Sequence, residues 1–269
     1  MKIAITGGLG FVGKHLVAEL TKKNIRIVLF DKKKHDLFKP KTLKDFLGGV
    51  DNVIHLAGVN RDDDFTNIIK VNVLGTKGIL DGMLAYAPTA KIIFASSFQA
   101  YLQQNIYGAS KKISEEFIEN YVQQKNLKAV VLRFTNMYGP GCKPYYNSAI
   151  ATFVYQAKRG KPIIINGNGR QKRDYLYVAD GVDAIYKAII YKPQKIIYLD
   201  ICSGKKTSLN EILRLLQKHS LKKIIVRYNK KAKSDDWGLN KNYQKAKNIL
   251  GFVPKISIAK GLRILMEGK

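Results

Sequence analysis

The sequence predicts an α/β fold in which helices cover both faces of a parallel sheet, and two patterns in its first half support this. Short apolar runs of strand length alternate with longer runs whose apolar residues recur at helical spacing. The first strand pattern, residues 2–5, also leads through a glycine-rich turn into a helix pattern at residues 14–20. Alternating strands and helices form a doubly wound sheet, which binds ligands at the carboxyl ends of its strands.

The glycine-rich turn at residues 6–13 reads TGGLGFVG, with glycines at positions 7, 10 and 13. Glycine allows a tight turn, close approach to a pyrophosphate and packing of the helix on its strand, while the helix N-terminus attracts phosphate. The spacing departs from the usual G-x-G-x-x-G, so a turn without a ligand is the alternative. The next apolar run, residues 25–30, ends at Asp31, whose carboxylate suits a ribose. Together these features predict a dinucleotide site.

The same alternation continues to residue 134. We expect strands at residues 53–56, 91–95 and 129–134, and helices at 43–47, 67–83 and 107–124. Beyond residue 139 the pattern is less regular. There we expect helices at 148–158, 178–191, 208–219, 242–250 and 258–266, and strands at 163–165 and 195–201, with Ser208 as a helix cap.

The order of these elements predicts that the chain forms a main domain and a smaller lobe. Residues 1–138 and about 170–204 form a Rossmann-like dinucleotide-binding domain, to which we assign the strand at 195–201. Residues of about 139–169 and 205–269 form a smaller lobe, which we expect to bind substrate at the edge of the sheet.

The charge balance bears on possible partners. There are 47 Lys and Arg against 20 Asp and Glu, a formal net charge of +27, which raises the hypothesis of nucleic-acid binding. Lysine is scattered, however, with dense runs only at residues 32–34 and 230–233, and there is no RNP-like aromatic motif or Cys/His finger. We therefore favour a solvated basic surface that attracts an anionic small substrate such as a sugar nucleotide.

Cysteine usage and apolar runs predict a cytoplasmic protein without a structural metal. Cys142 and Cys202 lie far apart, and no Cys or His cluster has zinc-ligand spacing. Residues 1–13 read as strand and turn and not as a signal peptide, and no run approaches the roughly 18 apolar residues of a membrane span.

The strongest local signal is YGASK at residues 107–111. A spacing of four on a helix places Tyr107 and Lys111 on one face, where the cation is expected to lower the tyrosine pKa from about 10 towards neutrality. Ser97, at the end of the preceding strand, can hold a carbonyl or carbinol oxygen against Tyr107. These side chains suit proton transfer between an alcohol and a ketone beside a nicotinamide, and an ordinary surface Tyr–Lys pair is the alternative.

Several motifs occur together along the chain: TGGLGFVG at Thr6, DNVIHLAG at Asp51, NVLGT at Asn72, FASS at Phe94, YGASK at Tyr107, LRFTNMYGP at Leu132, RDYLYV at Arg173 and NILGFVP at Asn248. As a set they resemble an extended short-chain dehydrogenase/reductase of the nucleotide-sugar epimerase, dehydratase and reductase group. The similarity covers nearly the full length.

The resemblance implies roles for the matching residues. The expected catalytic residues are Ser97, Tyr107 and Lys111, and Lys111 and Tyr107 also contact the cofactor. The other expected NAD(P) contacts are Gly7, Gly10, Phe11, Val12 and Gly13 at the pyrophosphate, Asp31 and Lys32 at the adenosine ribose, Asp36 and Leu37 at the adenine, Leu56, Ala57 and Gly58 beside the cofactor, and Phe134 at the nicotinamide. The expected substrate contacts are Ser97, Asn136, Asn147 and Arg173.

Two of these expectations keep alternatives open. Arg173 suits a diphosphate because guanidinium offers a fork of donors, but it could instead pair with Asp174. Asp31 repels a 2′-phosphate and suggests NAD, whereas the lysines at residues 32–34 suggest NADP, which we slightly favour. The resemblance also implies a homodimer through the helices that carry Tyr107 and Asn67.

Departures from the general pattern favour a reductase. AGVNRD at Ala57 and SSFQAYLQQNIYGASK at Ser96 are similar to the reductases of capsule and O-antigen synthesis that act on UDP-linked 4-keto-6-deoxy-N-acetylhexoses. Only nine residues separate Ser97 from Tyr107, and Phe98 and Gln99 stand where dehydratases carry acids. We expect NAD(P)H-dependent reduction of a 4-keto group on a nucleotide-linked, UDP-type deoxy sugar. A nucleotide-sugar 4-epimerase, or a non-catalytic dinucleotide-binding or nucleic-acid-associated protein, is the alternative.

Overall fold

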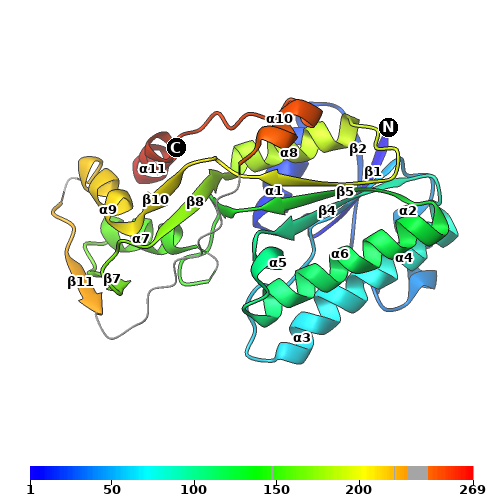
Figure 1. The fold of residues 1–269 in the computed structure, drawn as a ribbon, viewed down its shortest axis with the longest axis horizontal. Coiled ribbons are helices and arrows are strands. Elements are labelled where there is room, and N and C mark those ends of the chain that lie inside the picture. The colour runs from blue at the N-terminus through cyan, green and yellow to red at the C-terminus, as the bar shows by residue number, and fades with distance from the viewer. Residues whose placement is uncertain (147, 221, 230–241, 269) are drawn as a thin grey trace.

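The computed structural model describes residues 1–146, 148–220, 222–229 and 242–268. Its centre is a six-stranded sheet of the order β2-β1-β3-β4-β5-β9, in which every neighbouring pair is parallel (Figure 1). The strands are β1 (Lys2–Thr6), β2 (Arg26–Leu29), β3 (Asn52–His55), β4 (Lys91–Ser97), β5 (Lys128–Phe134) and β9 (Ile196–Ile201). The predicted fold class, a doubly wound parallel sheet, is confirmed.

Helices cover both faces of this sheet because side chains of a strand alternate between its faces. Ile3 and Ile5 pack in one core with α1 (Phe11–Lys22), α8 (Val178–Ile190) and α10 (Gln244–Leu250). Ala4 points to the other core, formed with α2 (Lys44–Leu47), α4 (Gly75–Tyr86) and α6 (Ile106–Lys125). Figure 1 shows the two layers above and below the strands.

The predicted helix at residues 67–83 is interrupted. It consists of α3 (Phe65–Ile69), a π-helical turn (Lys70–Leu74) and α4. The predicted helix at 43–47 is likewise a 3-10 turn (Pro40–Leu43) followed by α2, and a short helix, α5 (Gln99–Leu102), was not predicted. Short helical turns give too few residues for an apolar period to be read.

The rest of the chain builds two smaller sheets around a third core that contains Tyr138, Phe153, Ile212 and Leu262. One has the order β10-β8-β6 and the other pairs β11 with β7. Their elements are β6 (Asn136–Tyr138), α7 (Ala149–Lys158), β7 (Ile163–Asn166), β8 (Lys172–Tyr177), β10 (Lys206–Ser208), α9 (Leu209–Lys218), β11 (Val226–Asn229) and α11 (Ile258–Glu267). Of these, β6, β8, β10 and β11 were not predicted.

The chain therefore passes between the two parts more than once. β6 and β8 pair with each other in the smaller sheet, whereas α8 and β9 return to the main one. The division at residues 138, 170 and 204 stays a prediction. Ser208 caps α9 as expected, in a reciprocal capping box with Glu211. No helix within the described ranges is long and apolar enough to cross a membrane.

Candidate active site

A cavity of about 520 Å³ lies at the carboxyl ends of the main strands and extends to the smaller three-stranded sheet. It brings together most of the predicted site residues, which come from distant parts of the sequence. Those that line it are Gly7, Gly10, Phe11, Val12, Gly13, Leu56, Gly58, Ser97, Tyr107, Lys111, Phe134, Asn136 and Arg173. The lining does not include Asp31, Lys32, Asp36, Leu37 or Ala57, and Asn147 lies outside the described residues.

The glycine turn forms the first wall of the cavity and packs so closely that side chains would not fit. Gly7 has φ +69°, and a Cβ there would lie 2.7 Å from the amide nitrogen of Ala57. A Cβ on Gly13 would lie 2.1 Å from the carbonyl oxygen of Gly7. Gly10 is the N-cap of α1, and no side chain caps this helix end. The turn therefore presents backbone amides and the positive end of a helix dipole, which fits a pyrophosphate.

The loop after β2 carries the residues expected at the adenosine end. Asp31 accepts a hydrogen bond from the Lys33 amide at 2.9 Å, and the Asp31 amide donates to Nδ1 of His35 at 3.0 Å. Leu37 is buried in the core against α4, where its carbonyl oxygen would lie 1.7 Å from a Cβ on Gly78. Core packing accounts for Leu37, and the cofactor roles of this loop stay predictions.

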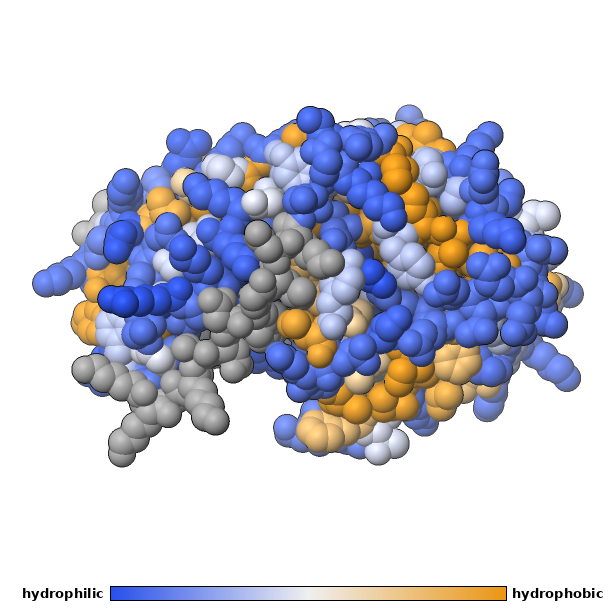
Figure 2. Space-filling model, viewed as in Figure 1, coloured by the Kyte–Doolittle hydropathy of each residue, from blue (hydrophilic) through white to orange (hydrophobic). Residues whose placement is uncertain are grey.

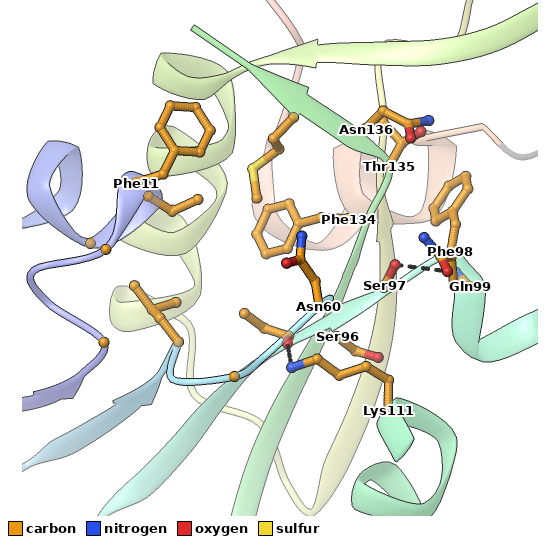
Figure 3. Close-up of a pocket in the computed structure, with 18 of the residues that line it drawn as sticks. Phe11, Asn60, Ser96, Ser97, Phe98, Gln99, Lys111, Phe134, Thr135 and Asn136 are labelled. Carbon is orange, nitrogen blue, oxygen red and sulfur yellow. Dashed lines mark hydrogen bonds between the residues drawn. The ribbon is translucent and has the colours of Figure 1, made fainter. Parts of the chain in front are cut away.

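Ser97, Tyr107 and Lys111 come together at the next wall. Ser97 is the last residue of β4, and Tyr107 and Lys111 lie in the first turns of α6. The Lys111 ammonium donates to the carbonyl oxygen of Ala95 at 2.8 Å (Figure 3). It also lies 4.6 Å from the ring centroid of Phe94. The same nitrogen is 6.0 Å from the ring centroid of Tyr107.

The electrostatics of this group differ from one expectation. Burial raises the pKa of Tyr107 to about 12, and a hydrogen bond with Ser97 offsets this only in part. Burial also lowers the pKa of Lys111 to about 8, against the attraction of Glu115. The prediction that Lys111 lowers the tyrosine pKa is therefore wrong for this structure, in which the ammonium turns towards Ala95. Tyr107 is protonated at neutral pH and suited to donate its proton.

A buried ion pair behind Ser97 was missed by sequence reasoning. Arg133 of β5 donates to both carboxylate oxygens of Glu115, at 2.9 and 2.6 Å, and the Ser96 hydroxyl donates to the same carboxylate at 2.5 Å. The Glu115 side chain is 1% exposed. This pair ties α6 to the strands that end at the cavity. Glu115 lies four residues after Lys111, and that helical spacing was the available signal.

Asn72 in the π-helical turn is a second residue that received no role from sequence. Its Oδ1 accepts from the Val59 amide at 2.8 Å, and its Nδ2 donates to the Val59 carbonyl and to Ser110 Oγ, each at 2.9 Å. It thus joins the segment after β3 to the helix of Tyr107 and Lys111. The NVLGT motif marked the position without indicating these contacts.

The far wall of the cavity is basic. Arg173 lines it together with Lys143, Lys172 and Lys206, which the sequence did not single out. Asn136 also lines the cavity, and its Nδ2 donates to the carbonyl oxygen of Asp174 at 3.0 Å. These cations suit the phosphates of an anionic substrate.

Comparison with known proteins agrees with this geometry. The NAD dependent epimerase/dehydratase family matches residues 3–199. A Methanocaldococcus jannaschii protein named "Putative UDP-glucose 4-epimerase" is 29% identical, over 97% of this chain and 96% of its own. The UDP-2-acetamido-2,6-beta-L-arabino-hexul-4-ose reductase of Pseudomonas aeruginosa is also 29% identical, over 80% of this chain and 57% of that enzyme.

Among solved structures, the UDP-glucose 4-epimerase of Thermotoga maritima with UDP-glucose is similar, with a TM-score of 0.88 and 26% identity over 99% of this chain and 98% of that chain. The family match covers the main sheet apart from Lys2 of β1 and the last two residues of β9, and it includes the glycine turn, Ser97, Tyr107 and Lys111. This protein therefore belongs to the NAD dependent epimerase/dehydratase family, within the extended short-chain dehydrogenases/reductases.

Proposed function

We propose that this protein is an NAD(P)H-dependent reductase of the 4-keto group of a nucleotide-linked deoxy sugar, with UDP as the nucleotide, for glycan precursor synthesis. One observation carries this proposal: Ser97, Tyr107 and Lys111 lie between the glycine turn and the basic wall of a single cavity. A dinucleotide bound at the glycine turn would place its nicotinamide at these side chains. A nucleotide sugar whose diphosphate lies on the basic wall would place its sugar there as well.

The proposed chemistry assigns one task to each side chain. Ser97 donates a hydrogen bond that orients the substrate carbonyl, and Tyr107 gives its proton to the developing alkoxide oxygen. Lys111 holds the nicotinamide ribose through the donors of its ammonium group. A nicotinamide bound along Gly58 and Phe134, which both line the cavity, would supply the hydride.

The neighbourhood of Ser97 supports a reductase over a dehydratase. Asn105 Oδ1 accepts from the Gly108 amide at 2.8 Å, so its Nδ2 is the atom that donates to Gln99 Oε1, also at 2.8 Å. Gln99 lines the cavity, and with its Oε1 occupied its side-chain nitrogen Nε2 is the group that it can present there. This nitrogen can only donate a hydrogen bond. Phe98 and Gln99 offer no acid or base for removing water from the sugar. Figure 3 shows both beside Ser97.

A 4-epimerase is the second candidate, favoured by the archaeal relative named for that activity, which matches 97% of this chain. The same side chains would then oxidise the hydroxyl and return the hydride to the other face of the keto sugar.

A panel of UDP-, dTDP- and GDP-linked 4-keto sugars, each assayed with NADH and NADPH, tests the proposal that the protein is a reductase. The reductase is expected to turn over a UDP-linked 4-keto-6-deoxy sugar fastest.

We propose NADP as the cofactor, which leads to a prediction for Lys32. This exposed lysine follows Asp31 in the loop after β2. Lys32→Ala is expected to raise KM for NADPH about tenfold, because a charged hydrogen bond to the 2′-phosphate is lost, and to leave KM for NADH nearly unchanged. Initial rates with both cofactors measure this. Lys128→Ala, at the opposite end of the sheet, should change neither value, and an equal change of both in Lys32→Ala would contradict the assignment.

We also propose that two copies associate through α4 and α6. Figure 2 shows apolar side chains gathered over these helices on the lower part of the molecule. Ile113 of α6 is 37% exposed, and Leu74, the last residue of the π-helical turn before α4, is 47% exposed. The mass of the protein in solution tests this association, and a cytoplasmic location stays a prediction.

A further inference from the structure

His55, the last residue of β3, is fully buried and has no part in the chemistry proposed above. Both of its ring nitrogens are hydrogen-bonded. Nδ1 lies 2.6 Å from the Thr6 hydroxyl, and Nε2 lies 3.1 Å from the Thr76 hydroxyl. The imidazole therefore bridges β1, just before the glycine turn, and α4, just after the π-helical turn.

The next contact outwards at each end fixes the direction of these hydrogen bonds. Thr76 Oγ1 lies 2.5 Å from the carbonyl oxygen of Asn72, and a carbonyl can only accept. The single proton of Thr76 is committed there, so the Thr76 oxygen must accept from Nε2 of His55. At the other end the Ala57 amide donates to Thr6 Oγ1 at 3.2 Å, which leaves the Thr6 proton for Nδ1.

Thr76 therefore requires a proton on Nε2 of His55. A buried ring without a counter-charge stays neutral, so Nδ1 carries the lone pair that accepts the Thr6 proton. The elements in contact support this, because Thr6, Thr76 and the Phe94 ring stacked at 5.7 Å carry no charge. Burial lowers the pKa of His55 to about 3, and the positive charge of Lys111 adds to this effect.

The hydrogen bonds from Thr6 through His55 to Thr76 reach both parts of the proposed site, the glycine turn and the helix α6. Thr6 precedes Gly7, and Ala57 lies 2.7 Å from where a Cβ on Gly7 would be. At the other end the Asn72 carbonyl also accepts from Ser114 of α6 at 2.9 Å, while the Asn72 side chain contacts Ser110 of the same helix. The Lys111 ammonium and Asn72 Oδ1 close on Gly58, at 3.4 and 3.1 Å from a Cβ built there.

We propose that His55 is a positioning residue that holds the glycine turn and the helix of Tyr107 and Lys111 at a fixed separation, as its neutral Nε2–H tautomer. It touches neither substrate nor cofactor and acts through Thr6 and Thr76. The inference about the tautomer stands on the hydrogen bonds and the burial of the ring, whereas the effect on catalysis rests on the proposed function. The two parts are therefore tested separately.

The tautomer is tested by ¹⁵N NMR of the imidazole rings in the full-length protein, whose sequence contains four histidines. The His55→Gln spectrum assigns the signal. His55 is expected to show a protonated Nε2 and an unprotonated Nδ1, with no titration from about pH 5 to pH 9, where an ordinary histidine titrates near 6.5. A titrating His55, or a proton on Nδ1, would overturn the proposal whether or not the protein turns over a sugar.

The positioning role is tested at Thr76, which lies outside the cavity lining. Thr76→Val keeps the shape of the side chain but cannot bridge His55 and Asn72, whereas Thr76→Ser keeps the hydroxyl. We expect kcat to fall roughly tenfold in Thr76→Val, with KM for the sugar nucleotide nearly unchanged and the rate restored in Thr76→Ser. An unchanged kcat in Thr76→Val, or the same loss of kcat in Thr76→Val and Thr76→Ser, would contradict the role of the hydroxyl. Absence of turnover in the unmodified protein would instead refute the proposed function and leave the NMR result standing.

Discussion

Tyr107→Phe is expected to lower kcat about a thousandfold while the affinity for the dinucleotide changes little. General acid catalysis typically contributes a factor of about 10² to 10⁴, and Tyr107 is the proposed proton donor. Its high pKa, about 12, means that the proton is present throughout the neutral range and is lost only to the substrate oxygen. Single-turnover rates and the Kd of NADPH, measured on the same preparation, separate chemistry from binding.

Tyr121→Phe provides the matched control, because it removes a phenol from the same helix. The Tyr121 hydroxyl donates to Asp81 at 2.5 Å and does not line the cavity. This variant should keep a near-normal rate. Retention of more than a tenth of the activity by Tyr107→Phe would show that another group donates the proton.

Glu115→Gln is expected to destabilise the protein by about 3 to 5 kcal/mol, the typical cost of removing one partner from a buried ion pair. The substitution leaves the Arg133 guanidinium, whose side chain is 14% exposed, without its countercharge. That cation also stacks between Tyr101 and Tyr198, at 4.3 and 4.7 Å from their ring centroids, so it cannot easily move to water. Denaturant unfolding followed by circular dichroism measures the loss.

Glu116→Gln is the control for this prediction, one residue further along α6. Glu116 pairs with Lys112 at 3.4 Å, with side chains 54% and 35% exposed. Such exposed pairs contribute about 0 to 1 kcal/mol, so the unfolding free energy should barely change. Similar losses in the two variants would mean that the buried pair does not stabilise the fold as a charge pair.

The sequence was sufficient to predict the main sheet and the helices on it, because its strands are short apolar runs and α8 has a clear apolar stripe. It also predicted that Tyr107 and Lys111 share a helical face. The residues expected at the cavity mostly line it, because strands in a parallel sheet end at one edge. Roles assigned to Asp31, Asp36 and the neighbouring residues depend on a ligand and stay predictions.

Features that depend on partners distant in sequence could not be predicted. The π-helical turn at Lys70–Leu74 is stabilised where Asn72 bonds to Val59 and Ser110, and apolar spacing does not reveal such contacts. The buried Glu115–Arg133 pair and the two contacts of His55 join residues on separate elements. The pKa of Tyr107 was mispredicted for the same reason, since the degree of burial is a property of the folded chain.

The most direct test of the proposed reduction follows nicotinamide absorbance and sugar products together in one reaction. With a UDP-linked 4-keto-6-deoxy-N-acetylhexose, we expect one equivalent of NADPH to be oxidised for each 4-hydroxy sugar formed, and Tyr107→Phe to abolish both signals. Interconversion of epimeric UDP-hexoses at constant nicotinamide absorbance, without net reduction of any keto sugar, would contradict the proposal and identify an epimerase.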